Sequence, residues 1–148
     1  MKSHSIILML IATLFTGCSS SYQGIKFRAQ SPPIEEAFRK ISLAITTDGY
    51  EIRSVEPSRF FLETSWRPLK EKEKSEGDVK LTGQKIESQL TVRLGRRGSL
   101  YDVQVRPSLR YMSADSTHEA VADVRHPLWE KWQRVLNSIA QKEIREED

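Results

Sequence analysis

Residue types that commonly perform catalysis or bind metals are sparse in this chain of 148 residues. Beyond residue 20 it contains only two histidines, His118 and His126, and no cysteine. His118 has Asp115 and Glu119 close by, but a helical zinc motif would need a second histidine at position 122, which is Ala122. The Gly-x-Ser-x-Gly elbow of serine hydrolases and the phosphate-binding Gly-x-x-x-x-Gly-Lys loop are also missing. We therefore expect no enzyme activity, no metal site and no cofactor.

Five arginines are the candidate binding residues. They occupy the polar positions and the turn of a predicted hairpin, so we expect them to gather on its solvent-facing side and tip: Arg93, Arg96, Arg97, Arg106 and Arg110. Guanidinium groups match the geometry of phosphates and carboxylates, which favours contact with lipid phosphates or an acidic partner. The alternative is a solvated sheet face whose charges prevent aggregation at the sheet edge.

The overall charge does not favour nucleic acid as a partner. The chain has 23 Lys and Arg against 20 Asp and Glu, a formal net charge of +3, and the two signs are mixed along the sequence. A nucleic-acid-binding domain would show a concentrated basic excess. The single cysteine, Cys18, allows no intramolecular disulfide and no thiolate metal site, so stability must come from packing.

The first 20 residues have the composition of a bacterial export signal. Lys2 precedes an apolar run from Ser5 to Thr16, and the small residue Gly17 stands directly before Cys18. The run is shorter than the ~20 residues that a membrane-spanning helix needs.

The segment 14–18, Leu-Phe-Thr-Gly-Cys, resembles the lipobox of bacterial lipoproteins. The resemblance implies that residues 1–17 are a lipoprotein signal peptide and that Cys18 is lipidated and becomes the N-terminus. Phe15 departs from the smaller aliphatic residue usual at that place. Two serines follow Cys18, with no Asp in second position, which by the same resemblance implies the periplasmic face of the outer membrane. The alternative is an ordinary secretory signal with an incidental cysteine.

The rest of the chain is long enough for one domain. We expect residues 18–30 to hold the lipidated cysteine, a short polar tether and a first strand, because apolar and polar residues alternate from Gly24 to Gln30. Residues 31–148 should form a single periplasmic domain.

Two amphipathic helices are predicted. The first carries apolar residues at helical spacing from Ile34 to Ile45 and stops before Asp48 and Gly49. The second begins at His126 and Pro127 and has an apolar stripe over 128–140, and residues 143–148 form a charged tail.

Four strands in two hairpins are predicted between these helices, because apolar and polar residues alternate with a period of two. They cover residues 50–53, 60–67, 86–94 and 101–111. In the second of them Phe60, Leu62, Thr64 and Trp66 should share the buried face, with Arg67 on the polar face. The Lys- and Glu-rich residues 68–83 are expected to be a solvated loop, either binding a partner or simply connecting the hairpins, and residues 113–125 are also expected to be a loop.

The last two strands allow a register to be proposed. If Leu94 lies opposite Tyr101, Arg93 faces Asp102 on the solvated side. Pro107 cannot donate to a ladder and therefore indicates an edge strand or a bulge. The predicted fold is α+β, an antiparallel sheet of four to five strands with two helices packed on one face.

Residues 34–39, 47–52 and 60–66 are similar to the domain opening of the BamC (NlpB) family, lipoproteins of the outer-membrane β-barrel assembly machinery. The shared features are an Ala-aromatic helix, a Gly-aromatic-x-aliphatic entry into a strand, and a second strand rich in aromatics and Thr. The resemblance covers roughly residues 31–67 and implies a helix-grip fold, with a long C-terminal helix on a curved sheet. The chain departs from the family in having room for one such domain and only about a dozen residues before it, so the partner-binding tail of that family is not carried over.

These inferences predict a non-catalytic outer-membrane lipoprotein whose periplasmic domain binds another envelope protein in an assembly or maintenance complex. The alternative is a carrier of a lipid or another small apolar ligand, with a cavity of ~300 Å³ or more between sheet and helix. Its lining would be Phe60, Leu62, Trp66, Tyr101 and Val103. An enzyme ranks third and would need a cleft with clustered carboxylates or His118.

Overall fold

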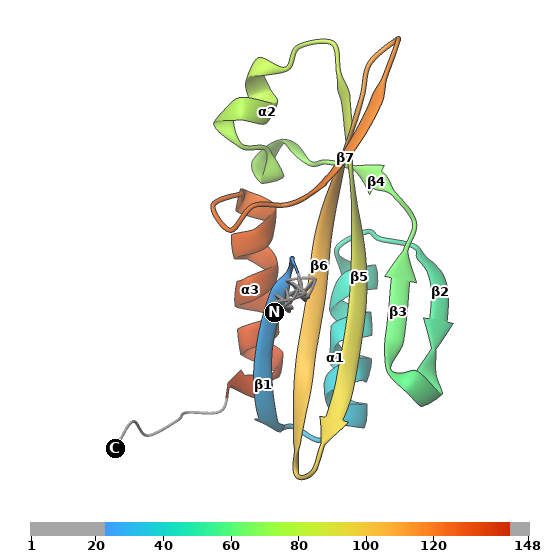
Figure 1. The fold of residues 1–148 in the computed structure, drawn as a ribbon, viewed down its shortest axis with the longest axis vertical. Coiled ribbons are helices and arrows are strands. Elements are labelled where there is room, and N and C mark those ends of the chain that lie inside the picture. Colours follow the sequence, from blue (N-terminus) through green and yellow to red (C-terminus); the bar gives the residue numbers. More distant parts are fainter. Residues whose placement is uncertain (1–22, 143–148) are drawn as a thin grey trace, which may run out of the picture.

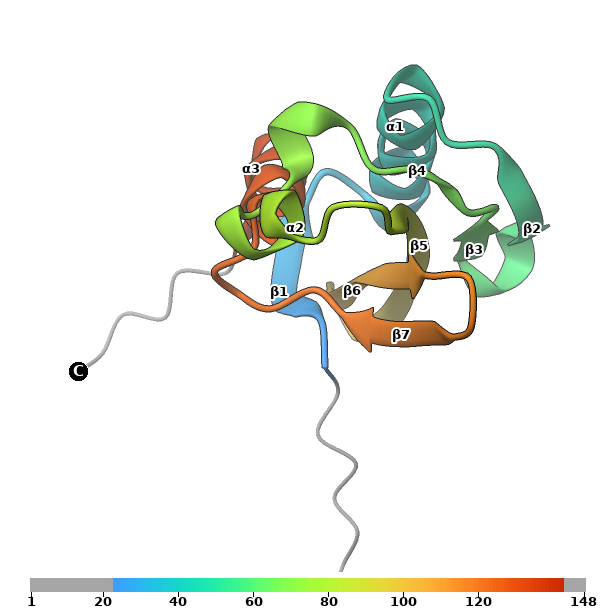
Figure 2. The ribbon, with the colours of Figure 1, turned by 90° about the horizontal axis from the view of Figure 1, so that it is seen from above.

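A computed structural model describes residues 23–142 as a curved antiparallel sheet with two main helices on one face (Figures 1 and 2). The predicted α+β fold class, with both helices on the same side, is confirmed. The predicted signal peptide, Cys18 and the tail 143–148 lie outside the described residues. No helix within residues 23–142 is long and apolar enough to cross a membrane.

The helices form where the apolar spacing predicts them. α1 (Ile34–Thr47) turns one stripe toward the sheet and buries Ile34, Ala37, Phe38, Ile41 and Ile45. α3 (Pro127–Ile139) buries Leu128, Trp132 and Leu136. The His126 ring caps α3, because its Nδ1 accepts the backbone N–H of Leu128 at 3.1 Å.

The sheet has eight strands within the described residues, and all of their pairings are antiparallel. The order is β2-β3-β5-β6-β1-β8, with β4 also on β5 and β7 also on β6. Their bounds are β1 (Ile25–Ser31), β2 (Ile52–Glu56), β3 (Phe61–Thr64), β4 (Arg67–Pro68), β5 (Lys85–Arg97), β6 (Leu100–Met112), β7 (Thr117–Val121) and β8 (Gln141–Lys142).

The predicted register of the central hairpin is wrong by two residues. Leu94 faces Val103, and Arg93 faces Gln104 rather than Asp102. The strands continue to Arg97 and Leu100, so the turn is only two residues long, and Gly98 adopts the positive φ of 63° that such a turn requires. Burial determines which side chains face inward, and an error of two residues leaves that unchanged.

Pro107 does not mark an edge strand or a bulge, because β6 has ladder partners on both sides. On one side β6 pairs with β1 as far as Val105 and with β7 from Ser108. The carbonyl of Pro107 accepts the N–H of Ala122 at 2.8 Å on that same side. The N–H that proline lacks would therefore point to the gap between β1 and β7, where no ladder bond is lost.

The two predicted loops are more ordered than their composition indicates. Residues 117–121 form β7, and the segment 68–83 contains a 3₁₀ turn, η2 (Glu71–Glu73), and a short helix, α2 (Glu76–Lys80). Leu69, Glu73 and Asp78 are buried there. A charged composition hides these contacts, because the charges that hold the segment are paired with residues far away in the sequence.

The predicted strand 60–67 is divided by a change of register. Phe61 lies opposite Arg93, whereas Arg67 lies opposite Ser88, so one extra residue is inserted between β3 and β4. A shift of one residue reverses the side-chain directions. Arg67 is therefore buried and Trp66 lies on the outer face, the opposite of the prediction.

The core fills the space between the helices and the inner face of the sheet. Leu90 and Val92 of β5 and Val103 of β6 are fully buried there, in the same core as Trp132 and Leu136 of α3. The Tyr50 ring packs edge-on against Trp132, with 6.1 Å between the centroids. Burial of these side chains against the sheet is what places both helices.

Shortening Leu136 to alanine tests this packing. We expect Leu136→Ala to lower the free energy of unfolding by about 2–5 kcal/mol, because it leaves a cavity under α3. The matched change Asn137→Ala, at the next and exposed position, should stay within about 0.5 kcal/mol of wild type. Urea unfolding followed by circular dichroism measures both values. Equal effects would contradict the observed orientation of α3.

Candidate functional site

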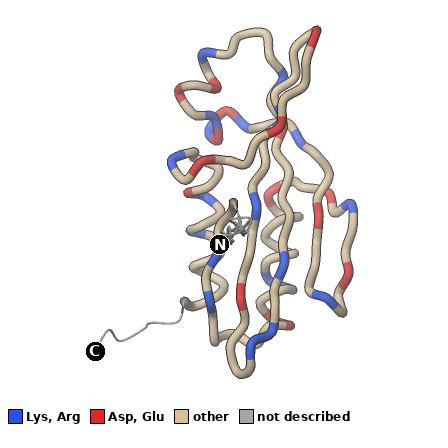
Figure 3. Tube along the Cα trace, in the orientation of Figure 1, with Lys and Arg blue, Asp and Glu red and all other residues tan. Residues whose placement is uncertain are grey.

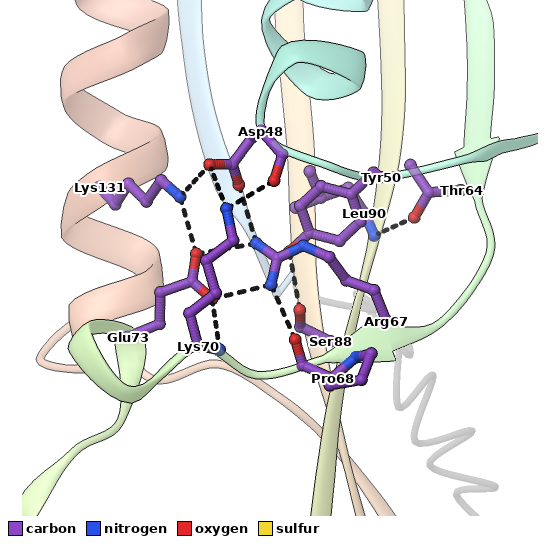
Figure 4. Close-up of polar contacts among 10 residues, drawn as sticks. All are labelled: Asp48, Tyr50, Thr64, Arg67, Pro68, Lys70, Glu73, Ser88, Leu90 and Lys131. Carbon is purple, nitrogen blue, oxygen red and sulfur yellow. Dashed lines mark hydrogen bonds and ion pairs between the residues drawn. The ribbon is translucent and has the colours of Figure 1, made fainter.

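One dense cluster of charged side chains lies between the helices and the sheet. We call it the polar clamp, and it consists of Asp48, Arg67, Lys70, Glu73 and Lys131 (Figure 4). The guanidinium of Arg67 donates to both carboxylate oxygens of Glu73, at 2.9 and 2.8 Å, and to Asp48 at 2.8 Å. This two-pronged geometry is the strongest form of the arginine–carboxylate pair.

The clamp joins three parts of the chain. Lys131 of α3 donates to Asp48 at 2.5 Å and to Glu73 at 2.7 Å, and Lys70 donates to the Asp48 carbonyl at 2.6 Å. Arg67 also lies over the Tyr50 ring, 3.9 Å from its centroid. The end of α1, the segment 67–73 and α3 are thereby held together.

The electrostatics of the clamp do not suit acid–base catalysis. Burial would raise the pKa of Glu73, but hydrogen bonds from Arg67 and Lys131 outweigh burial and lower that pKa to about 2. The pKa of Asp48 is lowered in the same way, against burial, by Lys131, Lys70 and Arg67. A general base needs a pKa near the working pH. Both carboxylates stay ionised and paired, and the clamp therefore acts as a structural connection.

A second buried network surrounds Asp78 of α2. Its carboxylate accepts a hydrogen bond from Tyr111 at 2.9 Å and lies 2.7 Å from Nε2 of His126. Because Nδ1 of His126 accepts from Leu128, the proton of the neutral ring is on Nε2 and is donated to Asp78. The network ties α2 to β6 and to the start of α3, which agrees with the interpretation of His126 as a helix-start residue.

The region around His118 does not form a metal site in the described residues. His118 stacks on Tyr111, with ring centroids 6.4 Å apart, and Asp115 and Glu119 are exposed. Within residues 23–142, no group of three or more His, Cys, Asp or Glu side chains is arranged to hold a metal ion.

The predicted arginines separate onto two faces of the sheet. Arg93, Arg106 and Arg110 alternate with buried residues of β5 and β6 and point away from the helices. Arg97 pairs with Asp102 at 3.1 Å beside the turn on this outer face. Arg96 lies on the other face, where it pairs with Glu35 of α1. Four of the five are therefore brought to the predicted face, and Arg96 is not.

Two further cations join this face through β1, which sequence analysis did not connect to β6. Lys26 lies opposite Gln104, and Arg28 lies opposite Asp102, with which it pairs at 3.3 Å. We call the resulting surface the basic face. It comprises Lys26, Arg28, Arg93, Arg97, Arg106 and Arg110, and Figure 3 traces its charges along the central strands. Lys26 and Arg28 were not predicted because the alternation of apolar and polar residues along β1 does not tell which strand β1 pairs with.

The cations of the basic face differ in how far they are neutralised. Arg110 pairs with Glu87 and covers the Trp66 ring, 4.5 Å from its centroid. Arg93 lies over the Phe61 ring at 5.9 Å. Among residues 23–142, Arg93, Arg106 and Lys26 form no ion pair with a carboxylate. These three are available for an external anion.

A hollow of about 440 Å³ opens on the basic face. Its lining combines one aromatic ring with hydroxyl, amide and guanidinium groups and one carboxylate: Gln23, Trp66, Gln89, Thr91, Arg106, Ser108, Glu119, Ala120 and Val121. Such a lining offers several hydrogen-bond donors around the Arg106 cation, with the Glu119 carboxylate in the same hollow. It suits contact with an anionic, polar surface better than enclosure of an apolar ligand.

The residues expected to line a carrier cavity have other roles. Leu62, Tyr101 and Val103 are packed in the core, and Phe60 packs edge-on against Phe38 with centroids 5.8 Å apart. Trp66 lies on the outer face. These five side chains therefore do not enclose a common cavity between sheet and helix.

Substituting Glu73 tests the clamp. We expect Glu73→Gln to lower the free energy of unfolding by about 3–5 kcal/mol at neutral pH, because the buried Arg67 charge loses its main partner. The neighbouring change Glu71→Gln, at an exposed side chain, should have little effect.

The pH dependence of the free energy of unfolding tests the role of the Glu73 carboxylate independently. Folding lowers the pKa of Glu73 from 4.5 to about 2, so the unfolded chain binds its proton first as the pH falls. The stabilisation is complete above pH 4.5 and is lost between there and pH 2, and Glu73→Gln should remove this part of the slope. Urea unfolding from neutral to acidic pH measures it. An unchanged slope would contradict the assignment.

No known protein-family model matches this chain, and no curated protein matches its sequence.

Proposed function

We propose that this chain is a non-catalytic lipoprotein of the outer membrane, anchored on the periplasmic side through acyl groups on Cys18. Its domain would act as a binding adaptor in an envelope-assembly or envelope-maintenance complex, with another envelope protein as its partner. The lipobox-like segment 14–18 supports the anchor. The basic face supports the binding role.

The observation that carries this proposal is the outer face of the sheet, which neither main helix covers (Figure 2) and on which residues 23–142 form no second core. Both main helices pack on the opposite side (Figure 2), and only the inner side is closed by a core. The outer side presents cations without carboxylate partners among residues 23–142, next to the half-buried rings of Phe61 and Trp66. Arginine and aromatic side chains are enriched where proteins make contacts. The component that touches this face should be acidic, because its charge would complement the unpaired cations.

Charge reversal on the basic face tests the binding role. In the full-length protein in its own membrane, we expect Lys26→Glu with Arg106→Glu to reduce the yield of crosslinked envelope components by roughly three- to tenfold. The matched control reverses Arg39 and Lys80, two exposed cations outside the sheet. Thermal unfolding of each variant verifies that it is folded. Equal yields from wild type and the Lys26/Arg106 variant would contradict the binding role of this face.

Metabolic labelling tests the anchor. Wild-type protein grown with an alkyne-bearing fatty acid should carry the label, and Cys18→Ser should lose it because serine offers no thiol to acylate. Ser20→Ala, two positions further on, should keep the label. A wild-type protein without label would favour the ordinary secretory signal.

A further inference from the structure

The chain enters the domain on the basic face. Gln23 lines the same hollow as Trp66 and Arg106, and β1 starts two residues later, at Ile25. In Figure 2 the start of β1 lies on the side of the sheet away from α1 and α3. Gln23 also lines a second hollow together with Trp129 of α3. The anchor proposed at Cys18 would therefore pull on the edge of the basic face that lies beside this helix.

The tether is short. Five residue steps separate Cys18 from Gln23, and a fully extended chain covers at most about 18 Å in that distance. If Cys18 is acylated, its acyl chains lie within the bilayer, and the hollow lies no further than this from the lipid headgroups. A small folded domain is about 30 Å across and does not fit into that gap. Beneath the hollow, the membrane surface can therefore make contact where a second folded domain cannot enter.

We propose that the basic face lies flat against the membrane that anchors the chain, with Lys26, Arg93 and Arg106 in contact with lipid phosphates. This inference rests on the proposed acylation of Cys18. It identifies lipid phosphate as the acidic component that contacts the basic face. The protein partner of the adaptor then reaches the domain only where the membrane leaves it uncovered.

The charges of the face suit phosphate groups. Ammonium and guanidinium groups donate several hydrogen bonds to phosphate oxygens. The carboxylates of Asp102 and Glu87 are each paired with two cations of the domain, and Glu63 is paired with Arg53, so their repulsion of phosphate is reduced. Glu119, opposite Arg110 on β7, has no cation partner among residues 23–142 and is the remaining negative charge beside this face. Attraction to anionic lipid decays within a Debye length, about 8 Å at physiological salt. The tether, at most about 18 Å long, brings the cations near that range, and contact with phosphate then holds them within it.

Depth-dependent quenching tests the orientation. The full-length acylated protein is reconstituted in vesicles containing phosphatidylglycerol, with a fluorophore on one introduced cysteine, since acylation would block Cys18. Gln104→Cys places the fluorophore on the outer face between Lys26 and Arg93, and Thr46→Cys places it on the exposed side of α1. Quenching by a lipid with a nitroxide on its headgroup should be at least about threefold stronger at position 104.

Charge reversal and high salt then test whether electrostatic attraction to lipid phosphates causes this orientation. Reversal of Lys26, Arg93 and Arg106 to glutamate, or salt at about 1 M, should lower quenching at position 104 toward that at position 46. Reversal of Arg39 and Lys80 should not. A twenty-residue Gly/Ser insertion after Ser21, about four times the native spacing, should leave the difference in place if phosphate contacts hold the face down. Equal quenching at both positions in wild type, or no response to charge reversal, would overturn the proposal.

Flotation separates this inference from the anchor on which it rests. A wild-type protein that does not float with the vesicles shows that acylation has failed, and with it the proposed lipoprotein. A protein that floats but shows equal quenching keeps its anchor and disproves the orientation. Crosslinking from position 104 to an acidic protein in cells, in place of lipid, would also overturn the membrane contact.

Discussion

The fold depends on one buried guanidinium. Arg67 is 8% exposed, and a charge removed from water is tolerated only with partners in close, well-oriented contact. Glu73 and Asp48 supply the negative charge, and Lys131 offsets the excess carboxylate on the side of α3. Because each partner belongs to a different segment, satisfying Arg67 determines how the end of α1, the 68–83 segment and α3 come together.

The position of Arg67 follows from a small feature of the sheet. One extra residue between β3 and β4 turns Arg67 inward and Trp66 outward. This one-residue shift in register therefore brings Arg67 into the clamp and places the Trp66 ring beside the basic face. A regular strand over 60–67 would place Trp66 in the core and Arg67 in solvent, which is what simple alternation indicates.

Periodicity predicts the parts of this fold that burial alone determines. It identifies both helices and the inward residues of β5 and β6, because one apolar stripe or face must meet the core. It fails where distant pairing decides the outcome. Glu73 and Asp78 look like solvated residues in a charged segment until Lys131 and His126 are brought beside them. β7 has exposed residues at four of its five positions and thus no alternation to detect.

The same limit applies to the basic face, where alternation on β5 and β6 brings four of the five predicted arginines to one side. Arg96 does not join them, because β5 continues three residues past the predicted strand end at Leu94, which gives Arg96 the direction of Leu94. Lys26 could not be found without the pairing of β1 with β6.

The clamp and the basic face also use arginine under opposite conditions. In the clamp, low solvent access makes an unpaired charge costly, so every charge is matched. On the exposed sheet face, water stabilises Arg106 and Lys26 without a partner, so folding places no demand on them and they remain available to an external anion.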